Sequence, residues 1–382
     1  MFILEKPYVS DHMLDYAART GTPVLRTPFT EAAARRFPLH LLDDTAFAAA
    51  LRAGKRLYTS SENALDWVYA HCAGSELTRC CDVMKDKAAL RTLLRGMYPD
   101  FFFKEIPAAA LAGTDAADLR FPCVLKPSVG FFSLGVRTVE RAEDWGKAVA
   151  EITADMAAYA AAFPASVLSG GMFLVEEYIR GEEFAVDMYY DEAGEPVILN
   201  IFQHRFASAE DVSDRLYCTG KAVIETWLDV FTRFFRTANA ALRIKNFPAH
   251  VELRVDGGRI VPIEFNPLRC AGMCCTDVAQ YAYGFDTYDY YLRNLKPDFT
   301  DILRDRAGWT YSMIILDKRP GIPDNAHLDF SALAGRLQTV LEMRDMEALH
   351  LPLFGIAFAR TDAAHAHQLD ALLTSDLSEF LR

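Results

Sequence analysis

HVELRVDGGRIVPIEFNP, residues 250–267, is the stretch of sequence that best defines the fold. Two apolar runs of alternating character flank a DGG turn at 256–258, a pattern typical of a β-hairpin. Because side chains alternate between the two faces of a strand, Glu264 and Asn266 should share a face. Glu252 on the first strand should lie opposite or diagonal to Glu264, with about 5 to 8 Å between their Cβ atoms. The hairpin therefore brings two carboxylates and one amide oxygen together.

Two carboxylates in this arrangement repel each other unless a cation lies between them. Octahedral Mg²⁺ that also contacts nucleotide phosphates prefers such oxygen ligands, and Mn²⁺ is an alternative. We therefore predict that Glu252, Glu264 and Asn266 are metal ligands. An exposed hairpin face neutralised by Arg254 and Arg259 is the other interpretation, but it gives no reason for Asn-Pro so soon after the second glutamate.

A second motif, FPCVLKPSVGFFSLGV at residues 121–136, combines a short apolar strand with a glycine-rich loop. The strand carries Lys126, and the loop contains Gly130, Ser133 and Gly135 before a second strand begins. Backbone N–H groups of such a loop can bind phosphate oxygens, and a lysine on the adjacent strand adds a fixed positive charge. Both features suit ATP, although a plain hairpin with a surface lysine would have the same pattern.

A third motif, FLVEEYIRGEEFAVDMYY at residues 173–190, ends an apolar strand at Glu176 and Glu177 and turns at Gly181 into a strand that carries Glu183. A segment that joins two lobes in this way can bind a purine through its backbone N–H and C=O groups. A carboxylate a few residues further on can accept hydrogen bonds from both ribose hydroxyls. A solvated acidic hairpin is the alternative interpretation.

Four basic side chains are candidates for binding an anionic substrate: His204, Arg205, Arg215 and Arg269. An arginine can bind a substrate carboxylate with two hydrogen bonds or neutralise a developing acyl phosphate. Arg269 follows the proposed metal ligands closely in the sequence. The other three stand out less from ordinary surface or structural residues.

In this order, the motifs closely resemble those of the ATP-grasp superfamily of ligases, of the carboxylate-amine ligase type. The matching patterns are K-P-x-x-G-x-x-S-x-G-V at 126–136, V-E-E-Y-I-x-G-x-E at 175–183, and a strand-borne Glu252 followed by E-x-N-P at 264–267. The resemblance spans residues 80 to 295, approximately. It implies an ATP-grasp fold preceded by a small α/β domain, with ATP and Mg²⁺ (or Mn²⁺) as cofactors.

The resemblance also implies roles for individual residues. Lys87 is similar to the first ATP-binding lysine of the family, and Lys126 to the second, which contacts phosphates and adenine; Lys126 and Arg269 are the implied catalytic residues. The implied lid residues are Ser133 and Gly135, the implied adenine-binding residues are Glu176, Glu177 and Ile179, the implied ribose-binding residue is Glu183, and the implied magnesium ligands are Glu252, Glu264 and Asn266. One departure concerns Arg269, because many relatives have arginine directly after Asn-Pro, whereas Leu268 intervenes here.

Enzymes of this family activate a carboxylate with the γ-phosphate of ATP, and an amine then displaces phosphate from the acylphosphate. The resemblance therefore implies a ligase that joins an amino acid or similar small acid to an amine. An ATP-grasp kinase or carboxylase needs the same phosphate and metal residues and is a second hypothesis. A non-catalytic ATP-binding module is a third, against which the retention of Glu252, Glu264 and Asn266 argues.

The whole sequence predicts a multidomain α/β and α+β protein with four consecutive regions. Residues 1–85 alternate strand and helix patterns, which predicts an open α/β domain with a parallel sheet. Residues 86–185 and 186–300 are expected to form the two lobes that enclose ATP, the first with the glycine-rich loop and the second with the hairpin. Residues 301–382 are expected to form a C-terminal α/β extension, in which no chemical motif is recognisable.

Composition limits the remaining function classes. The 52 Asp and Glu residues exceed the 40 Lys and Arg residues, and the net charge of −12 does not favour nucleic acid as a partner. Charges interrupt the N-terminus, and Pro164 interrupts the uncharged stretch 156–175, so neither a signal peptide nor a membrane span is expected. The eight cysteines lack zinc-binding spacing and are expected to be reduced. We expect a cytoplasmic protein with a small-molecule acid and an amine as substrates; homodimers are common for such folds, but no interface pattern is visible.

Overall fold

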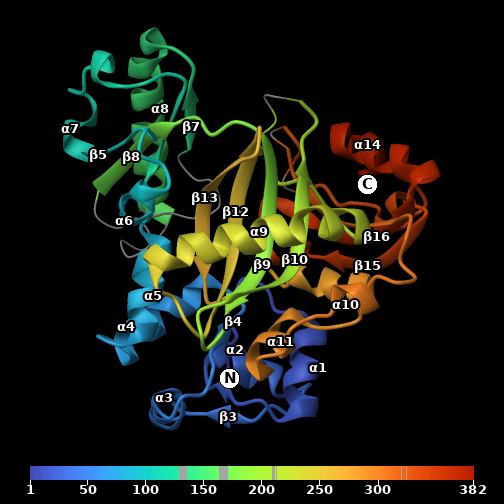
Figure 1. Ribbon diagram of the computed structural model, residues 1–382. Coiled ribbons are helices and arrows are strands. Elements are labelled where there is room, and N and C mark those ends of the chain that lie inside the picture. Colours follow the sequence, from blue (N-terminus) through green and yellow to red (C-terminus); the bar gives the residue numbers. More distant parts are fainter. Residues whose placement is uncertain (129–135, 163–170, 209–210, 212, 320, 324) are drawn as a thin grey trace.

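The computed structural model describes residues 1–128, 136–162, 171–208, 211, 213–319, 321–323 and 325–382, with only the backbone for 156–162. The described chain contains three β-sheets: a four-stranded parallel sheet at the N-terminus, a four-stranded antiparallel sheet, and an eight-stranded antiparallel sheet. Figure 1 shows the eight-stranded sheet in the middle, with the small antiparallel sheet on one side and the N-terminal domain below.

The N-terminal domain has the open α/β architecture that the sequence predicts. Its strands β1 (Phe2–Ile3), β2 (Val24–Leu25), β3 (Leu41–Leu42) and β4 (Tyr58–Thr59) run parallel in the order β3-β2-β1-β4. The helices between and after them are α1 (Asp11–Thr20), α2 (Pro28–Ala33), α3 (Asp44–Arg52) and α4 (Leu65–His71). Ser10 caps α1, since its hydroxyl accepts the N–H of Met13, and Gly21 ends this helix in the left-handed conformation.

The small antiparallel sheet follows two helices, α5 (Glu76–Lys85) and α6 (Lys87–Leu93). Its strands are β5 (Phe103–Pro107), β6 (Cys123–Pro127), β7 (Arg137–Val139) and β8 (Met172–Glu177), in the order β5-β8-β6-β7. Helices α7 (Ala108–Leu111) and α8 (Trp145–Ala162) belong to the same region. Ile106, Leu125, Ile152 and Val175 are buried in an apolar core of its own, so this lobe is a separate packing unit.

The eight-stranded sheet has the order β13-β12-β9-β10-β11-β14-β16-β15, and every neighbouring pair is antiparallel. Its strands are β9 (Glu182–Tyr190), β10 (Pro196–Arg205), β11 (Leu216–Thr219), β12 (Phe247–Asp256), β13 (Arg259–Pro267), β14 (Trp309–Asp317), β15 (Thr339–Asp345) and β16 (Leu353–Asp362). The shorter helices of this region are α10 (Val278–Tyr283), α11 (Thr287–Arg293), α12 (Phe299–Ile302), α13 (Phe330–Ala334) and α14 (Ala366–Thr374).

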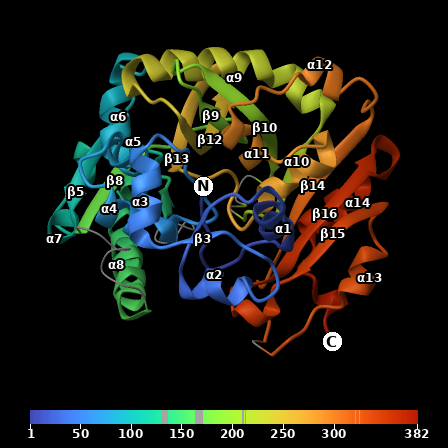
Figure 2. The same cartoon turned by 90° about the horizontal axis from the view of Figure 1, so that it is seen from below.

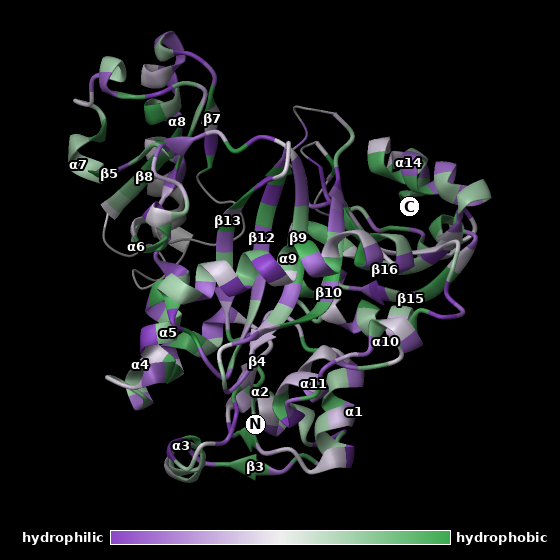
Figure 3. Cartoon of the chain, viewed as in Figure 1, coloured by the Kyte–Doolittle hydropathy of each residue, from purple (hydrophilic) through white to green (hydrophobic). Residues whose placement is uncertain are grey.

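Helix α9 (Lys221–Leu242) covers one side of this sheet, and the N-terminal domain lies on the other (Figure 2). The helix buries Ile224, Phe231, Phe235 and Leu242, which are spaced four or seven residues apart and so lie on one face. Polar and apolar colours accordingly alternate along α9 in Figure 3. Phe184 on β9 packs against the rings of Trp227 and Phe231 on α9. Because side chains alternate along a strand, the even-numbered residues of β9 face α9 and the odd-numbered residues face the other side of the sheet.

Two features of the strand order bear on the expected division into four regions, which stays a prediction. Strands β14, β15 and β16 of the expected C-terminal extension continue the sheet that contains the hairpin, so 301–382 contributes to that body. The change from the small sheet to the large sheet lies between β8 and β9, whereas the expected boundary at residue 185 falls within β9. Both features result from pairing between strands that are far apart in sequence. Local sequence patterns do not indicate which distant strands will pair.

In the described residues, no helix has the length and apolar character needed to cross a membrane. All eight cysteines are described and none is in a disulfide. Burial raises the pKa of the Cys274 and Cys275 thiols to about 12, so both are neutral near pH 7. These two cysteines are part of the apolar core, and their neutral thiols are not activated as nucleophiles.

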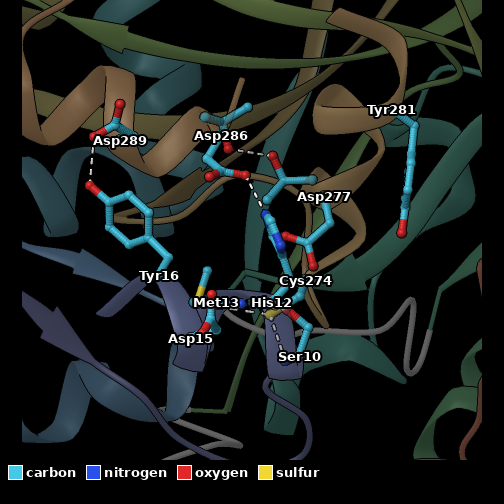
Figure 4. Close-up of polar contacts among 12 residues, drawn as sticks. Ser10, His12, Met13, Asp15, Tyr16, Cys274, Asp277, Tyr281, Asp286 and Asp289 are labelled. Atoms are coloured by element: carbon cyan, nitrogen blue, oxygen red, sulfur yellow. Dashed lines mark hydrogen bonds and ion pairs between the residues drawn. The ribbon is translucent and has the colours of Figure 1, made fainter. Parts of the chain in front are cut away.

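Polar contacts join α1 of the N-terminal domain to the segment 274–289, as Figure 4 shows. His12 Nε2 lies 2.6 Å from Asp286 Oδ1, and the Tyr16 hydroxyl donates to Asp289 at 2.6 Å. The buried rings of Phe2 and Tyr288 meet edge to face at 5.7 Å. These contacts fix the N-terminal domain against the body that carries the hairpin.

The His12–Asp286 contact should make part of this stability depend on pH. The hydrogen bond to Asp286 raises the pKa of His12 above its ordinary value of 6.5. Its contribution is therefore complete below that ordinary value and is lost as the pH rises through the folded-state pKa. His12→Gln should remove this dependence, which should amount to less than about 1 kcal/mol because the imidazole is 35% exposed.

Urea unfolding at about pH 5.5 and about pH 8.5 measures the effect as a difference between wild type and variant. His40→Gln is the control, since His40 is exposed on the same domain. A His12→Gln protein whose stability changes with pH as wild type does would contradict the assignment.

Candidate active site

The hairpin of β12 and β13 places the proposed metal ligands side by side. Glu252 pairs directly with Glu264, as the sequence predicts, and the register skips Ile263 in a β-bulge immediately afterwards. The amide N–H of Asn266 donates to Glu264 Oε1 at 3.3 Å, so these two side chains share a face. Lys87 Nζ lies 2.8 Å from Glu264 Oε2. A lysine at the start of α6 thus meets the hairpin.

The charges at this point are unevenly distributed. Burial disfavours ionisation of Glu264, but the Lys87 ammonium, together with the Lys85 and Lys126 charges, outweighs burial and lowers the pKa of this carboxyl. For Glu252, burial and the nearby Glu264 and Glu183 charges act together and raise its pKa well above the ordinary value. A cation between Glu252 and Glu264 would relieve this repulsion.

The donor set fits a magnesium ion that is held partly by phosphate. Among the described residues, no group of three His, Cys, Asp or Glu side chains is placed to hold a metal ion without help. The hairpin itself offers two carboxylates, from Glu252 and Glu264, and one amide oxygen, from Asn266. Mg²⁺ in nucleotide sites is commonly bound by one or two carboxylates together with substrate phosphates and water. The assignment of these three residues as ligands remains a prediction.

Lys126 and Glu176 form a buried ion pair that the sequence did not predict. Lys126 Nζ lies 2.5 Å from Glu176 Oε1, and Arg91 donates to both oxygens of the same carboxylate, at 2.6 and 3.1 Å. Burial alone would raise the pKa of Glu176, but the Arg91 and Lys126 cations lower it to about 2. The side chain of Glu176 is therefore engaged, and adenine could meet only the backbone at this position.

The other two expected hinge residues, Glu177 and Ile179, also form hydrogen bonds within the protein. The Glu177 carboxylate accepts the Phe102 N–H at 3.1 Å, and the Glu177 N–H donates to the Phe102 carbonyl at 3.0 Å. The Ile179 carbonyl accepts a hydrogen bond from Arg254 Nη1 at 2.8 Å. The segment between β8 and β9 is thus held on both sides, as a connector between lobes requires. Its adenine-binding role stays a prediction.

Glu183, the expected ribose ligand, lies between two basic side chains. Its Oε1 is 2.8 Å from His204 Nδ1, and its Oε2 accepts from Arg254 Nε at 2.9 Å. Burial opposes ionisation, yet His204 and Arg254 lower the pKa of Glu183. His204 is stacked on the Tyr217 ring, with centroids 4.1 Å apart. The structure thus places His204 against Glu183, and its role in substrate binding stays a prediction.

Arg269 lies at the junction with the N-terminal domain. Its Nη2 donates to Glu62 Oε1 at 2.8 Å, and Glu62 also pairs with Lys85. Leu268, which separates Arg269 from Asn-Pro, is fully buried at a φ of +62°, and its carbonyl accepts the Thr59 N–H at 2.8 Å. The extra residue therefore packs against β4, and the guanidinium that follows it turns toward Glu62.

The structure does not bring two of the predicted substrate residues into this cluster. Arg205 pairs with Asp370 at 2.5 Å in an exposed position. Arg215 is fully buried and donates to the carbonyls of Leu372 and Ser375, both at 3.1 Å, so it anchors the end of α14. The predicted lid residues Gly130, Ser133 and Gly135 lie outside the described residues.

A buried aspartate, Asp187 on β9, organises the loop that follows the hairpin. It accepts hydrogen bonds from His250 Nδ1 at 2.7 Å, from the Ala271 N–H at 2.8 Å, and from the Thr276 hydroxyl at 2.8 Å. Asp187 is fully buried, and the other nitrogen of His250 points toward Glu252 at 3.9 Å. One carboxylate therefore sets the position of both the hairpin and the Arg269 loop.

Asp187→Ala should lower the free energy of unfolding by about 3 to 5 kcal/mol, because His250, the Ala271 N–H and Thr276 would lose a shared buried partner. Urea denaturation followed by circular dichroism measures the loss. Asp256→Ala at the exposed hairpin turn is the matched control and should change stability little. If the two variants proved equally stable, Asp187 would not have this organising role.

Comparison with known proteins identifies the domain to which these elements belong. Residues 119–277 match the family model of the ATP-grasp domain. The chain contains an ATP-grasp domain. The match covers β6 to β13, and so includes Lys126, Glu176, Glu183 and the hairpin of β12 and β13.

Solved structures share the fold of this chain over 94% to 100% of its length. An L-amino acid ligase from Bacillus licheniformis is 18% identical, with a TM-score of 0.69, over 100% of this chain and 97% of its own. An N5-carboxyaminoimidazole synthase from Aspergillus clavatus, in complex with ADP and 5-aminoimidazole ribonucleotide, is 14% identical. Its TM-score is 0.66, over 97% of this chain and 98% of its own. A biotin carboxylase from Campylobacter jejuni is 12% identical, with a TM-score of 0.61 over 94% and 87%. No curated protein matches the sequence.

Proposed function

We propose that this protein is an ATP- and Mg²⁺-dependent ligase that joins a carboxylate to an amine through an acylphosphate and releases ADP and phosphate. The observation that carries the proposal is the meeting of Lys87 with Glu264 beside Glu252 and Asn266, on a hairpin that faces the lobe of Lys126. Cations for phosphate and oxygen ligands for a metal are the two requirements of phosphoryl transfer. ATP would lie between the two lobes.

The residues would divide the work by charge. Lys87 and Lys126 would neutralise phosphate oxygens, and Glu252, Glu264 and Asn266 would hold Mg²⁺. When bound, the metal supplies charge neutralisation and alignment of the phosphate groups. Arg269 would act on the acid or on the acylphosphate, with Glu62 and Lys85 fixing its position. No protein nucleophile is needed.

The proposed chemistry has two balanced steps. A carboxylate oxygen of the acid attacks the γ-phosphorus, the bond to the β–γ bridging oxygen breaks, and ADP leaves. The amine then attacks the acyl carbon, the bond to phosphate breaks, and the amine loses a proton to solvent. Positioning and charge neutralisation supply the rate enhancement in this type of reaction.

The fold neighbours support an acid and an amine as substrates. The likeness to the L-amino acid ligase supports an amino acid or similar small acid as the substrate. The likeness to the biotin carboxylase supports a carboxylase as the second candidate function. An ATP-grasp kinase would use the same residues with an alcohol as acceptor. We expect the protein to act in the cytoplasm, on small molecules and without nucleic acid, and a homodimer remains an expectation.

The test is ADP release with ATP and Mg²⁺ across a matrix of amino acids, small carboxylic acids and amines, supplied singly and in pairs. The ligase requires ADP release that depends on both an acid and an amine, with a product whose mass is the sum of the two minus water. ADP release with an alcohol alone would favour the kinase, and release with bicarbonate would favour the carboxylase. Tight ATP binding without turnover on any substrate would favour the non-catalytic module.

A further inference from the structure

Arg91 is a buried cation to which neither the sequence motifs nor the proposed chemistry gives a role. It lies one helical turn after Lys87 on α6, so both side chains point from the same helix face toward the site. Arg91, Glu176 and Lys126 have side chains that are 3%, 2% and 7% exposed. Glu176 lies between the other two and forms hydrogen bonds to both.

Arg91 also connects the two lobes. While Nε and Nη2 donate to Glu176 on β8, Nη1 donates to the Pro262 carbonyl at 2.7 Å, and Nη2 lies 3.4 Å from the Ile263 carbonyl. β13 is an edge strand, and its bulge at Ile263 directly precedes Glu264. One guanidinium therefore joins the end of β8 in the small sheet to the hairpin of the large sheet.

The net charge of this group decides what Lys126 can do. Lys126 paired with Glu176 alone would form a neutral pair and would attract phosphate weakly. With Arg91 bound to the same carboxylate, the group of three carries one net positive charge in a buried position, where charges are poorly screened. The Lys85–Glu62–Arg269 group repeats this arrangement of two cations on one carboxylate.

We propose that Arg91 is a positioning residue for ATP: it binds the Glu176 carboxylate together with Lys126, so that the group of three keeps a net positive charge for the nucleotide phosphates, and it holds the two lobes at a fixed separation. This inference rests on the proposed function, because it requires Lys126 to face bound ATP. It assigns the buried Glu176 carboxylate to the positioning of cations, in place of a contact with adenine.

The test is isothermal titration of ATP and ADP, with Mg²⁺, into wild type, Arg91→Met and the double variant Arg91→Met/Glu176→Gln. Arg91→Met should weaken ATP binding at least about tenfold, which corresponds to about 1.4 kcal/mol. The double variant should recover much of the loss, because Glu176→Gln removes the charge that would otherwise neutralise Lys126. A purely structural role of Arg91 predicts no such recovery.

Arg95→Met is the matched control, since Arg95 is exposed at the end of the same helical segment and should bind ATP as wild type does. If Arg91→Met does not fold, as judged by circular dichroism, Glu176→Gln alone provides the test and should bind ATP at least as tightly as wild type. Wild-type affinity in Arg91→Met, an equally weak double variant, or weaker binding by Glu176→Gln would each overturn the inference. A wild-type protein that binds neither nucleotide would overturn the proposed function as well.

Discussion

Glu264→Gln is expected to lower the rate of Mg²⁺-dependent ADP release by at least about 10²-fold, the effect typical of removing one group that stabilises transition-state charge. The amide keeps the shape of the side chain but cannot balance the charge of a metal ion or of Lys87, which lies 2.8 Å away. ADP release with the acid and amine found in the substrate matrix measures the rate. Mn²⁺ binding in the presence of ADP, followed by electron paramagnetic resonance, measures the metal site separately.

The choice of glutamine follows from the burial of Lys87. Glu264→Ala would leave the buried Lys87 ammonium with neither a counter-charge nor a hydrogen-bond acceptor at this position, and loss of one partner of a buried pair costs about 3 to 5 kcal/mol, so a loss of activity could then reflect unfolding. Glutamine keeps a carbonyl oxygen that can accept a hydrogen bond from Lys87. Glu182→Gln at the exposed start of β9 is the control and should retain wild-type turnover. Unchanged ADP release and Mn²⁺ binding in Glu264→Gln would remove Glu264 from the metal site.

Lys126→Met is expected to weaken ATP binding by about 10-fold to 10²-fold, because the nucleotide phosphates lose the cation presented by β6. The fold should survive, since Glu176 keeps its two hydrogen bonds to Arg91. Calorimetric titration of ATP measures the affinity. Lys147→Met on α8 is the control, because this side chain is 79% exposed. An unaltered affinity in Lys126→Met would exclude this lysine from the nucleotide site.

Features that depend on local pattern could be predicted from the sequence. The DGG turn and the alternation on either side of it predicted the hairpin and the shared face of Glu264 and Asn266, and the β-bulge at Ile263 then brings Glu264 directly opposite Glu252. Alternating strand and helix patterns in the first 85 residues likewise indicated the parallel sheet. In the hairpin the interacting residues are close in sequence, and in the N-terminal domain each strand and helix has its own local pattern, although β1 pairs with the distant β4.

The partners of the site residues could not be predicted, because they are far apart in sequence. Glu176 meets Arg91 85 positions away, Glu183 meets Arg254 71 positions away, and Arg269 meets Glu62 207 positions away. A weak signal for Arg91 existed, since it follows Lys87 by one helical turn. Arg254 shares a strand face with Glu252 and could have been found by the same alternation.

There is also a physical reason why the carboxylates of Glu176 and Glu183 are already paired with cationic or basic side chains of the protein. A carboxylate buried as deeply as Glu176 needs a cation in the folded chain itself, because an unpaired buried charge is too costly. Sequence motifs indicate which residues gather at a site but not whether their charges are already balanced within the protein. The motifs therefore did not indicate that Glu176 binds Arg91 and Lys126, or that Glu183 binds His204 and Arg254. The nucleotide-binding role of Glu183 stays a prediction.

Transfer of oxygen from the acid to phosphate tests the central proposal most directly. With the acid labelled with ¹⁸O in its carboxylate, ATP, Mg²⁺ and the amine, mass spectrometry of the released phosphate reports whether an acylphosphate forms. The account predicts that each phosphate carries one labelled oxygen, because the carboxylate attacks the γ-phosphorus and the acyl carbon–oxygen bond later breaks. Released phosphate without the label, formed at the same rate as the product, would contradict it.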